Sequence, residues 1–403
     1  MFAKVFLLHR LHLLTKNAKV FEFKKGRRRE RVMAKGAASP MEKVMERVMA
    51  KATPSQLPKM MPNPKPAIEF SQDMNIRPQT TASPFQVELT APDISAYRSS
   101  NVGIDYVTRL DSGKPGPHVI VQALTHGNEL SGAITLDYLF KQNFQPTCGV
   151  VSFIFANVAA YLMWDPANPD GNRYVEEDFN RVWSDEVLNG PRDSVELRRA
   201  RELVAYIDTA DYLLDLHSMS APSAPLMVCG VRPKGGQKSI NLSAKIGLPE
   251  WLMMDTGHVN GLRMIERAAF GDPSKHNTAI LLEAGQHWEK ACEQIARETT
   301  LKFLKVTGVT LADWADSRCS LPPVEQKVVQ VTEGYAAKSL DFQWLDVYNG
   351  LEVIEKSGTA LAEDAGHAVC TPYDQAVLIM PTRSKRFTVG STMVRYGRVE
   401  GLS

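Results

Sequence analysis

The sequence predicts an α/β layered domain followed by a smaller all-β region. From Phe85 onward, short apolar runs alternate with longer amphipathic patterns, and this alternation indicates helices packed on a sheet. After Pro322 and Pro323 the pattern changes to short alternating runs separated by glycines, which is typical of all-β structure. The 403 residues, of which 44% are hydrophobic and 23% are charged, are enough to bury a sizeable core.

The individual elements follow from the spacing of apolar residues. A short apolar run predicts a strand, and a repeat of three to four residues predicts a helix. Strands are expected at 118–124, 150–155, 212–215 and 279–282, and helices at 130–139, 194–207 and 290–304.

Residues 1–80 differ from the rest of the chain. The first 35 residues contain eleven Lys and Arg against two Glu, and residues 36–80 are rich in Pro, Lys, Met and Ser. Apart from a short helical pattern at 41–50, no periodicity is sustained there. We expect a basic, Pro-rich, disordered leader. It is either an organelle transit peptide or extra sequence upstream of an internal start such as Met33 or Met41.

Charge and cysteine content narrow the class of protein. The 47 basic and 45 acidic residues leave a formal charge of +2, so neither a nucleic acid nor a membrane surface is an expected partner. Since no stretch of about 18 apolar residues occurs, no membrane-spanning helix is expected. The five cysteines are far apart and odd in number, which argues against a disulfide framework or a thiolate zinc site and favours a reducing, cytoplasmic location.

Three residues at strand ends could together hold a metal ion. His126 and Glu129 follow the first predicted strand, and His217 follows the strand at 212–215. Gly127 is expected to loosen the turn between the first two, so that imidazole and carboxylate converge. A lone His is more often a packing or surface residue, but His126 alone among the nine histidines has this spacing. Three protein ligands and an open position for water are typical of catalytic zinc.

Further polar residues near the strand ends have two interpretations each. Asp215 shares a strand face with His217, so it either orients that ring or is a buried strand-end carboxylate. Glu283 ends an apolar run, and it is either a solvated residue at a strand edge or a general base. The loop with Arg173, Asn180 and Arg181 is either ordinary surface charge or a site that holds a carboxylate.

Four short motifs, in this order and at these separations, resemble the succinylglutamate desuccinylase and aspartoacylase family, a branch of the zinc carboxypeptidase superfamily. They are His-Gly-Asn-Glu at 126–129, Asp-Phe-Asn-Arg at 178–181, Asp-Leu-His at 215–217 and Glu-Ala-Gly at 283–285. Phe179 stands where this family usually has Leu, which is a conservative change. The resemblance covers roughly residues 85–400.

The resemblance implies a fold and a set of residue roles. The fold is a zinc-carboxypeptidase-like α/β/α sandwich with a mixed sheet at 81–321, and a C-terminal β domain at 322–403 that caps the active site. One zinc ion per chain is the implied cofactor. The implied zinc ligands are His126, Glu129 and His217, and the implied general base is Glu283. Arg173 is implied to polarise the scissile carbonyl. The implied pair that holds the substrate carboxylate is Asn180 and Arg181.

The expected activity is hydrolysis of the amide bond in a small N-acylated, carboxylate-bearing substrate by a metal-activated water. Two alternatives are a zinc carboxypeptidase that acts on peptides and a catalytically silent metal-binding homologue. The C-terminal domain favours small substrates over peptides, and the presence of every ligand and of the base argues against the silent homologue. The sequence leaves open which acyl group and which amine the substrate contains. It also leaves open the oligomeric state, which can be a homo-oligomer.

Overall fold

The computed structural model describes residues 85–385 and 387–401, and these belong to one compact unit. The expected leader at 1–80 lies outside the described residues. Within the described part of the chain, no helix has the length and apolarity needed to cross a membrane.

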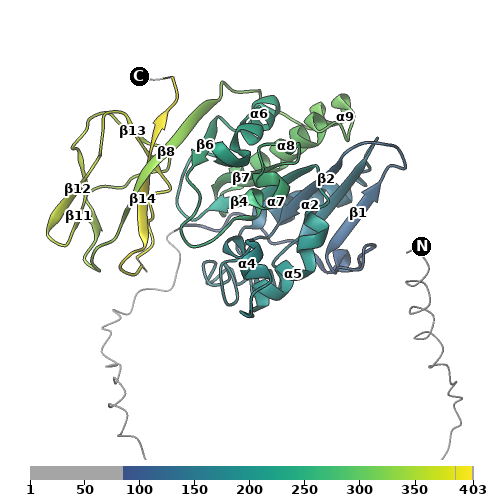
Figure 1. Cartoon of the computed structure of the whole chain (residues 1–403), viewed down its shortest axis with the longest axis horizontal. Helices are drawn as coiled ribbons and strands as arrows, with labels where there is room; N and C mark the ends of the chain where they lie inside the picture. Colours follow the sequence, from purple (N-terminus) through teal and green to yellow (C-terminus); the bar gives the residue numbers. More distant parts are fainter. Residues whose placement is uncertain (1–84, 386, 402–403) are drawn as a thin grey trace, which may run out of the picture. The chain divides into compact units, whose positions relative to one another are not determined.

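A large mixed sheet runs through this unit (Figure 1). Its eleven strands lie in the spatial order β1 (Val107–Asp111), β3 (Val150–Phe155), β2 (His118–Ala123), β4 (Tyr212–Met219), β7 (Thr278–Gln286), β5 (Leu226–Val231), β6 (Trp251–Asp255), β8 (Lys327–Ala336), β14 (Thr392–Val399), β13 (Ala376–Ile379) and β10 (Val353–Ile354). Neighbours from β3 to β7 are parallel, whereas β1 is antiparallel to β3 and β5 is antiparallel to β7. The parallel strands β2 and β4 therefore end at one edge of the sheet, next to the last residues of β7.

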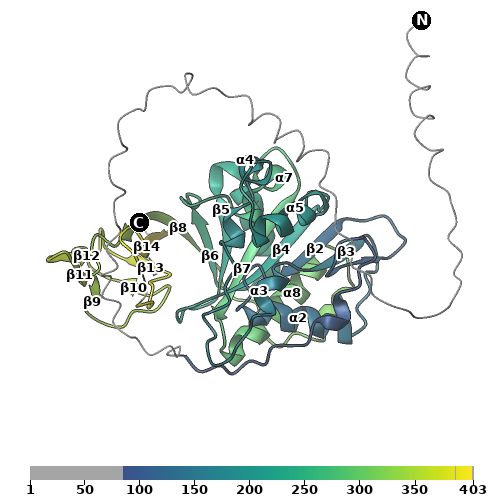
Figure 2. The ribbon, with the colours of Figure 1, turned by 90° about the horizontal axis from the view of Figure 1, so that it is seen from below.

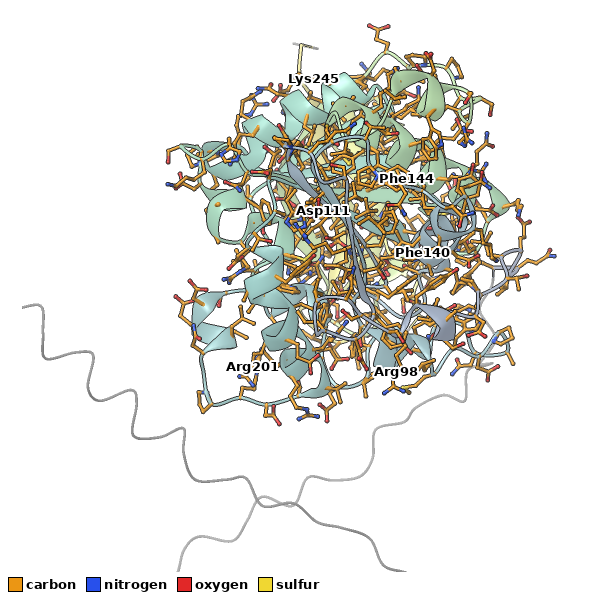
Figure 3. All side chains as sticks on the ribbon, turned by 90° about the vertical axis from the view of Figure 1, so that its right-hand side faces the viewer. Arg98, Asp111, Phe140, Phe144, Arg201 and Lys245 are labelled. Atoms are coloured by element: carbon orange, nitrogen blue, oxygen red, sulfur yellow. The ribbon has the colours of Figure 1, made fainter. Side chains whose placement is uncertain are left out.

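Helices cover both faces of this sheet because its central strands are apolar on both sides. In β2, Val119 and Val121 belong to one buried cluster, and Ile120 between them belongs to the other. The first cluster includes residues of α2 (Leu130–Lys141), α6 (Gln237–Ile246) and α8 (Lys290–Val306), and the second includes residues of α5 (Val195–Ile207). Figure 3, which faces the β1 edge, shows Phe140 of α2 and Arg201 of α5 on opposite sides of the sheet. Such continuous apolar strands are typical of a sheet buried on both faces.

The predicted strands and helices from residue 118 onward are all present, and the short helical pattern at 41–50 lies outside the described residues. Two strands are longer than predicted: β4 continues from Asp215 to Met219, and β7 continues from Leu282 to Gln286. The polar residues at 215–217 and 283 indicated strand ends, but backbone pairing between β4 and β7 continues through His217 opposite Glu283, with a register shift before Met219. As a result, His217 and Glu283 lie inside paired strands, where their backbones are held more firmly than in a loop.

The C-terminal residues form the predicted β structure. Its first strand, β8, pairs in parallel with β6, so the central sheet continues past Pro322 and Pro323 into β14, β13 and β10. A second sheet contains β9 (Gln343–Trp344), β11 (Ala360–Asp364) and β12 (His367–Cys370) (Figure 2). The fold as a whole is the predicted mixed α/β sheet with a C-terminal β region.

Candidate metal centre and active site

The turn after β2 brings the first two candidate ligands together. Leu124 has a positive φ of 61°, so the chain changes direction at once after the strand. Gly127 is required by a close backbone approach: an added Cβ would lie 2.5 Å from the carbonyl oxygen of Asn172. Gly127 was expected to loosen the turn, but the structure shows instead that it lets the backbone at Asn172 pack closely. The N–H of Gly127 donates to the Arg173 carbonyl at 3.0 Å. The result is that Glu129 lies at the first turn of α2 with its side chain directed at His126.

His126, Glu129 and His217 form one buried cluster. One donor atom from each lies within 4.8 Å of the other two. The Nδ1 atoms of His126 and His217 lie 2.7 Å and 2.9 Å from the two carboxylate oxygens of Glu129. All three side chains are at most 3% exposed. Two imidazole nitrogens and a carboxylate that converge from three directions are a donor set that fits a catalytic zinc ion.

The outward-facing nitrogen of each imidazole is held by another carboxylate. Nε2 of His217 lies 2.8 Å from Oδ2 of Asp215, and Nε2 of His126 lies 3.1 Å from Oδ1 of Asp178. An N–H donated by His217 to Asp215 leaves Nδ1 of His217 free to bind a metal and fixes the ring, whereas Nε2 of His126 also lies 3.0 Å from Nη2 of Arg173. The interpretation of Asp215 as the residue that orients His217 agrees with this contact.

The electrostatics of the cluster favour a bound cation. Burial alone would raise the pKa of Glu129, but His126 and His217 outweigh burial and the pKa falls well below its ordinary value. Burial would lower the pKa of His217, yet Asp215 and Glu129 raise it well above the usual range. A buried carboxylate between two imidazoles thus attracts positive charge, which a divalent metal ion can supply.

Glu283 lies on β7 opposite His217 of β4. Its Oε2 atom is buried and has no hydrogen-bond partner among the described residues. Burial, followed by the repulsion from Glu129, raises the pKa of Glu283 to about 8 despite the attraction of His217. Glu283 lies within the paired part of β7 and not at the end of that strand, and its side chain is partly exposed toward the cavity that it lines.

A cavity of about 330 Å³ adjoins the cluster. Glu129, Arg173 and Glu283 line it. The guanidinium of Arg173 donates from Nη1 to Oε1 of Glu129 at 3.2 Å, and its side chain is 36% exposed. The segment after His217 contributes Ser218, Met219, Ser220, Ala221, Pro222 and Ser223, and the C-terminal region contributes Met380, Pro381 and Thr382. Asn128, Asp170 and His287 complete the wall. The carboxylates of Glu129 and Glu283 and the guanidinium of Arg173 therefore face the same cavity.

Asn180 and Arg181 lie outside the lining of this cavity, in a short 3-10 turn at Phe179–Arg181. The side-chain oxygen of Asn180 accepts a hydrogen bond from the N–H of Met264 at 3.2 Å, so its amide nitrogen is available as a donor. Arg181 donates from Nη1 to the Asn180 carbonyl at 2.7 Å. Burial and the nearby cations, Arg173 first among them, lower the pKa of Arg181 although Asp178 opposes this.

Sequence reasoning missed several residues that contact the site. Asp178 was part of a motif, but nothing in its spacing indicated that it would bind His126. His287 is 1% exposed, lines the cavity and lies with its Nδ1 2.7 Å from Oγ of Ser218. Met380, which directly follows β13, reaches the same cavity from a part of the chain that lies far away in the sequence. For His287 its place just after the Glu-Ala-Gly motif was a usable signal, whereas no local pattern indicates Met380.

The comparisons agree with the motifs. Residues 115–307 match the family model described as the succinylglutamate desuccinylase/aspartoacylase catalytic domain. A protein named "Probable aspartoacylase" from Parasynechococcus marenigrum (strain WH8102) is 31% identical over 140 residues, which are 33% of this chain and 45% of that protein. Another of the same name, from Prochlorococcus marinus (strain MIT 9515), is 29% identical over 150 residues, which are 36% of this chain and 47% of that protein. The match thus spans about half the length of these curated relatives.

Solved structures share the fold at low sequence identity. A succinylglutamate desuccinylase/aspartoacylase from Rhodobacter sphaeroides has a TM-score of 0.53 at 15% identity, over 73% of this chain and 89% of that chain. The product-bound ectoine utilization protein from Ruegeria pomeroyi has a TM-score of 0.52 at 15% identity, over 76% of this chain and 92% of that chain. At this identity the likeness establishes the fold alone. Together with the sequence match, it leads to one conclusion: residues 115–307 are similar to the succinylglutamate desuccinylase/aspartoacylase catalytic domain.

Proposed function

We propose that the chain is a zinc-dependent amidohydrolase that removes a small acyl group from an N-acyl amino acid or a related carboxylate-bearing amide. The observation that carries the proposal is the buried group of His126, Glu129 and His217 beside a cavity that Glu283 and Arg173 also line. Zinc bound by this donor set supplies Lewis acidity: it polarises a carbonyl and lets water lose a proton near neutral pH.

Glu283 is suited to move the proton. In the ionised form of Glu283, the unpartnered Oε2 atom can accept a proton from the attacking water and then donate it to the nitrogen of the leaving amine. The amide C–N bond breaks as the new C–O bond is completed, so the products are a carboxylic acid and an amine. Because the water supplies both the hydroxyl group added to the carbonyl carbon and the proton added to the nitrogen, no covalent intermediate with the chain is needed.

Arg173 and the clamp residues position the substrate. The guanidinium of Arg173 faces the cavity, so it can donate to the amide oxygen as negative charge develops there. The free amide nitrogen of Asn180 and the guanidinium of Arg181 provide donors for one substrate carboxylate. Holding this carboxylate turns binding energy into orientation of the scissile bond.

The cavity wall supports a small substrate over a peptide. Met380, Pro381 and Thr382, from the C-terminal region, lie on the same wall as Ser220 and Ser223. A wall closed by these residues restricts the space beyond the metal ligands, whereas a peptidase that acts on peptides needs an open cleft. This contribution of the C-terminal region is in keeping with its proposed role as a cap.

The test is a hydrolysis screen with the zinc-loaded full chain. Acetyl, succinyl and formyl derivatives of Asp, Glu, ornithine and diaminobutyrate are the substrates, with a short peptide as the competitor. We expect release of the free amine from at least one N-acyl amino acid, and loss of release in His126→Ala. The exposed His276 gives the matched control, since His276→Ala leaves the cluster intact. Release of C-terminal residues from the peptide alone would establish a carboxypeptidase, and no turnover by zinc-loaded protein would contradict the proposal.

A further inference from the structure

Glu196 is a buried carboxylate that holds the loop after Arg173. It lies in the first turn of α5 and is 0% exposed. Its Oε1 atom accepts from the backbone N–H of Val175 at 2.7 Å, and its Oε2 atom accepts from the N–H groups of Glu176 and Glu177 at 3.1 Å and 3.2 Å. Consecutive N–H groups that point at one carboxylate form an anion-binding concavity, and the N-terminus of a helix favours the same negative charge. The carboxylate therefore fixes the backbone of this loop.

The loop binds the start of α5 in return. The carboxylate of Glu177 accepts from Oγ of Ser194 and pairs with Arg192 at 2.8 Å. The carboxylate of Glu176 accepts from the N–H of Val195. Because hydrogen bonds run in both directions, the loop has one defined position relative to the helix.

Asn157 connects the same carboxylate with the turn after β2. Its Nδ2 atom donates to Oε1 of Glu196 at 3.1 Å. Its backbone N–H donates to the carbonyl of Leu124 at 2.8 Å, where the chain turns toward His126. Glu196 thus binds the loop of Arg173 directly and is linked to the turn of His126 through Asn157.

The residues at the two ends of the loop contact the metal cluster. Before it, Arg173 donates from Nη1 to Oε1 of Glu129 at 3.2 Å, and its Nη2 lies 3.0 Å from Nε2 of His126. After it, Oδ1 of Asp178 lies 3.1 Å from the same imidazole nitrogen. A shift of the backbone at 175–177 therefore moves the guanidinium of Arg173 relative to the cluster.

We infer that Glu196 is a positioning residue, which holds the loop so that Arg173 can donate to the amide oxygen of the substrate. This inference rests on the proposed function, in which Arg173 offsets the negative charge that develops on that oxygen. A glutamine at this position would offer one oxygen to the donors and turn its own amide group toward the others, so buried N–H groups would lose their acceptor. The loop should then shift, and the guanidinium should move away from the reacting carbonyl.

The experiment is a double-mutant cycle on zinc-loaded full-length protein, with the acetyl derivatives of Asp, Glu, ornithine and diaminobutyrate as substrates. Glu196→Gln should lower kcat by about 10- to 100-fold and change KM by less than about 3-fold, because the displaced group acts in the transition state. Arg173→Met should lower kcat by about 10²- to 10³-fold. The double variant should be no slower than Arg173→Met, since residues that act as a unit do not have additive effects. Zinc content should stay at about one per chain.

Glu298→Gln is the matched control. Glu298 is also buried and accepts from the backbone N–H groups of Ser320 and Leu321, which lie outside the lining of the cavity. Its replacement should lower the temperature of thermal unfolding, as Glu196→Gln does, and leave kcat unchanged. An equal loss of kcat in this control would overturn the inference, because lower stability alone would then account for the loss.

If Glu196→Gln does not fold, the same cycle is measured with Glu196→Asp, which keeps the charge and shortens its reach. Its loss of kcat should likewise disappear when Arg173 is replaced. Losses that add in the double variant would overturn the inference while the proposed function stands, and so would loss of zinc from the Glu196 variant. Failure of the native chain to hydrolyse any of these substrates would overturn both.

Discussion

His217 and Asp215 lie two residues apart on β4, and their side chains meet with Nε2 of His217 2.8 Å from Oδ2 of Asp215. Both side chains are almost fully buried. The contact turns Nδ1 of the same ring toward Glu129. One strand therefore supplies a candidate ligand together with the carboxylate that orients it, and this arrangement can be tested separately from the ligands themselves.

Asp215→Asn should weaken zinc binding by about 10- to 100-fold, because an amide cannot hold the ring as a carboxylate does. The zinc affinity would be measured by competition with a chromophoric chelator. Asp211 provides the matched control: it lies just before the same strand and contacts the exposed His276, so Asp211→Asn should retain the native affinity. Native affinity in Asp215→Asn would show that Asp215 does not orient the ligand.

Glu283→Gln should lower kcat by roughly 10² to 10⁴ and leave KM little changed, because glutamine cannot accept and return a proton. Zinc content measured by elemental analysis should stay at about one per chain, since Glu283 is not among the three proposed ligands. Loss of zinc together with loss of rate would instead mean that Glu283 holds the metal site together. A loss of kcat without a loss of zinc thus identifies Glu283 as a base, whereas a loss of both identifies it as a residue that stabilises the metal site.

Arg181→Ala should mainly raise KM, because Arg181 is proposed to hold the substrate carboxylate equally in the ground state and in the transition state. A smaller decrease in kcat is expected because the substrate is then oriented less well. An analogue in which the substrate carboxylate is replaced by an amide should be poor for the native chain and lose little more in the variant. Equal losses on both substrates would assign Arg181 to support of the loop at 178–181.

The fold and the grouping of His126, Glu129 and His217 could be predicted from the sequence because both depend on local patterns. The alternation of apolar runs identifies β2 and β4, and polar residues at their ends identify His126 and His217. Two kinds of information were inaccessible. Pairing between strands decides where β4 and β7 end, and this depends on partners distant in the sequence. The approach of Met380 depends on β13 and β14 joining the sheet beyond β8, which no single segment encodes.

The wall of the cavity leads to the last prediction, which concerns the acyl group. Its apolar members are Met219, Ala221, Pro222, Met380 and Pro381. Among the described residues that line it, Arg173 is the one Lys or Arg, and it already donates to Glu129. An acyl group with a terminal carboxylate would therefore lie beside the acidic residues of the cavity without a free cation to pair with. Removing that carboxylate from water without a partner is costly. With the amine half at Arg181, an uncharged acyl group should be preferred in the cavity.

N-acetyl derivatives should accordingly be hydrolysed with a kcat/KM at least about 10-fold higher than N-succinyl derivatives of the same amino acid, a difference of about 1.4 kcal/mol. Thr382→Lys would place a cation in the cavity wall, and it should narrow this preference by raising the rate on the succinyl substrate. Thr388→Lys adds the same charge at an exposed position outside the lining, so it should leave the preference unchanged. A native preference for succinyl substrates would show that the cavity holds the amine half, and the substrate would then bind in the reverse orientation, with its acyl group toward Arg181.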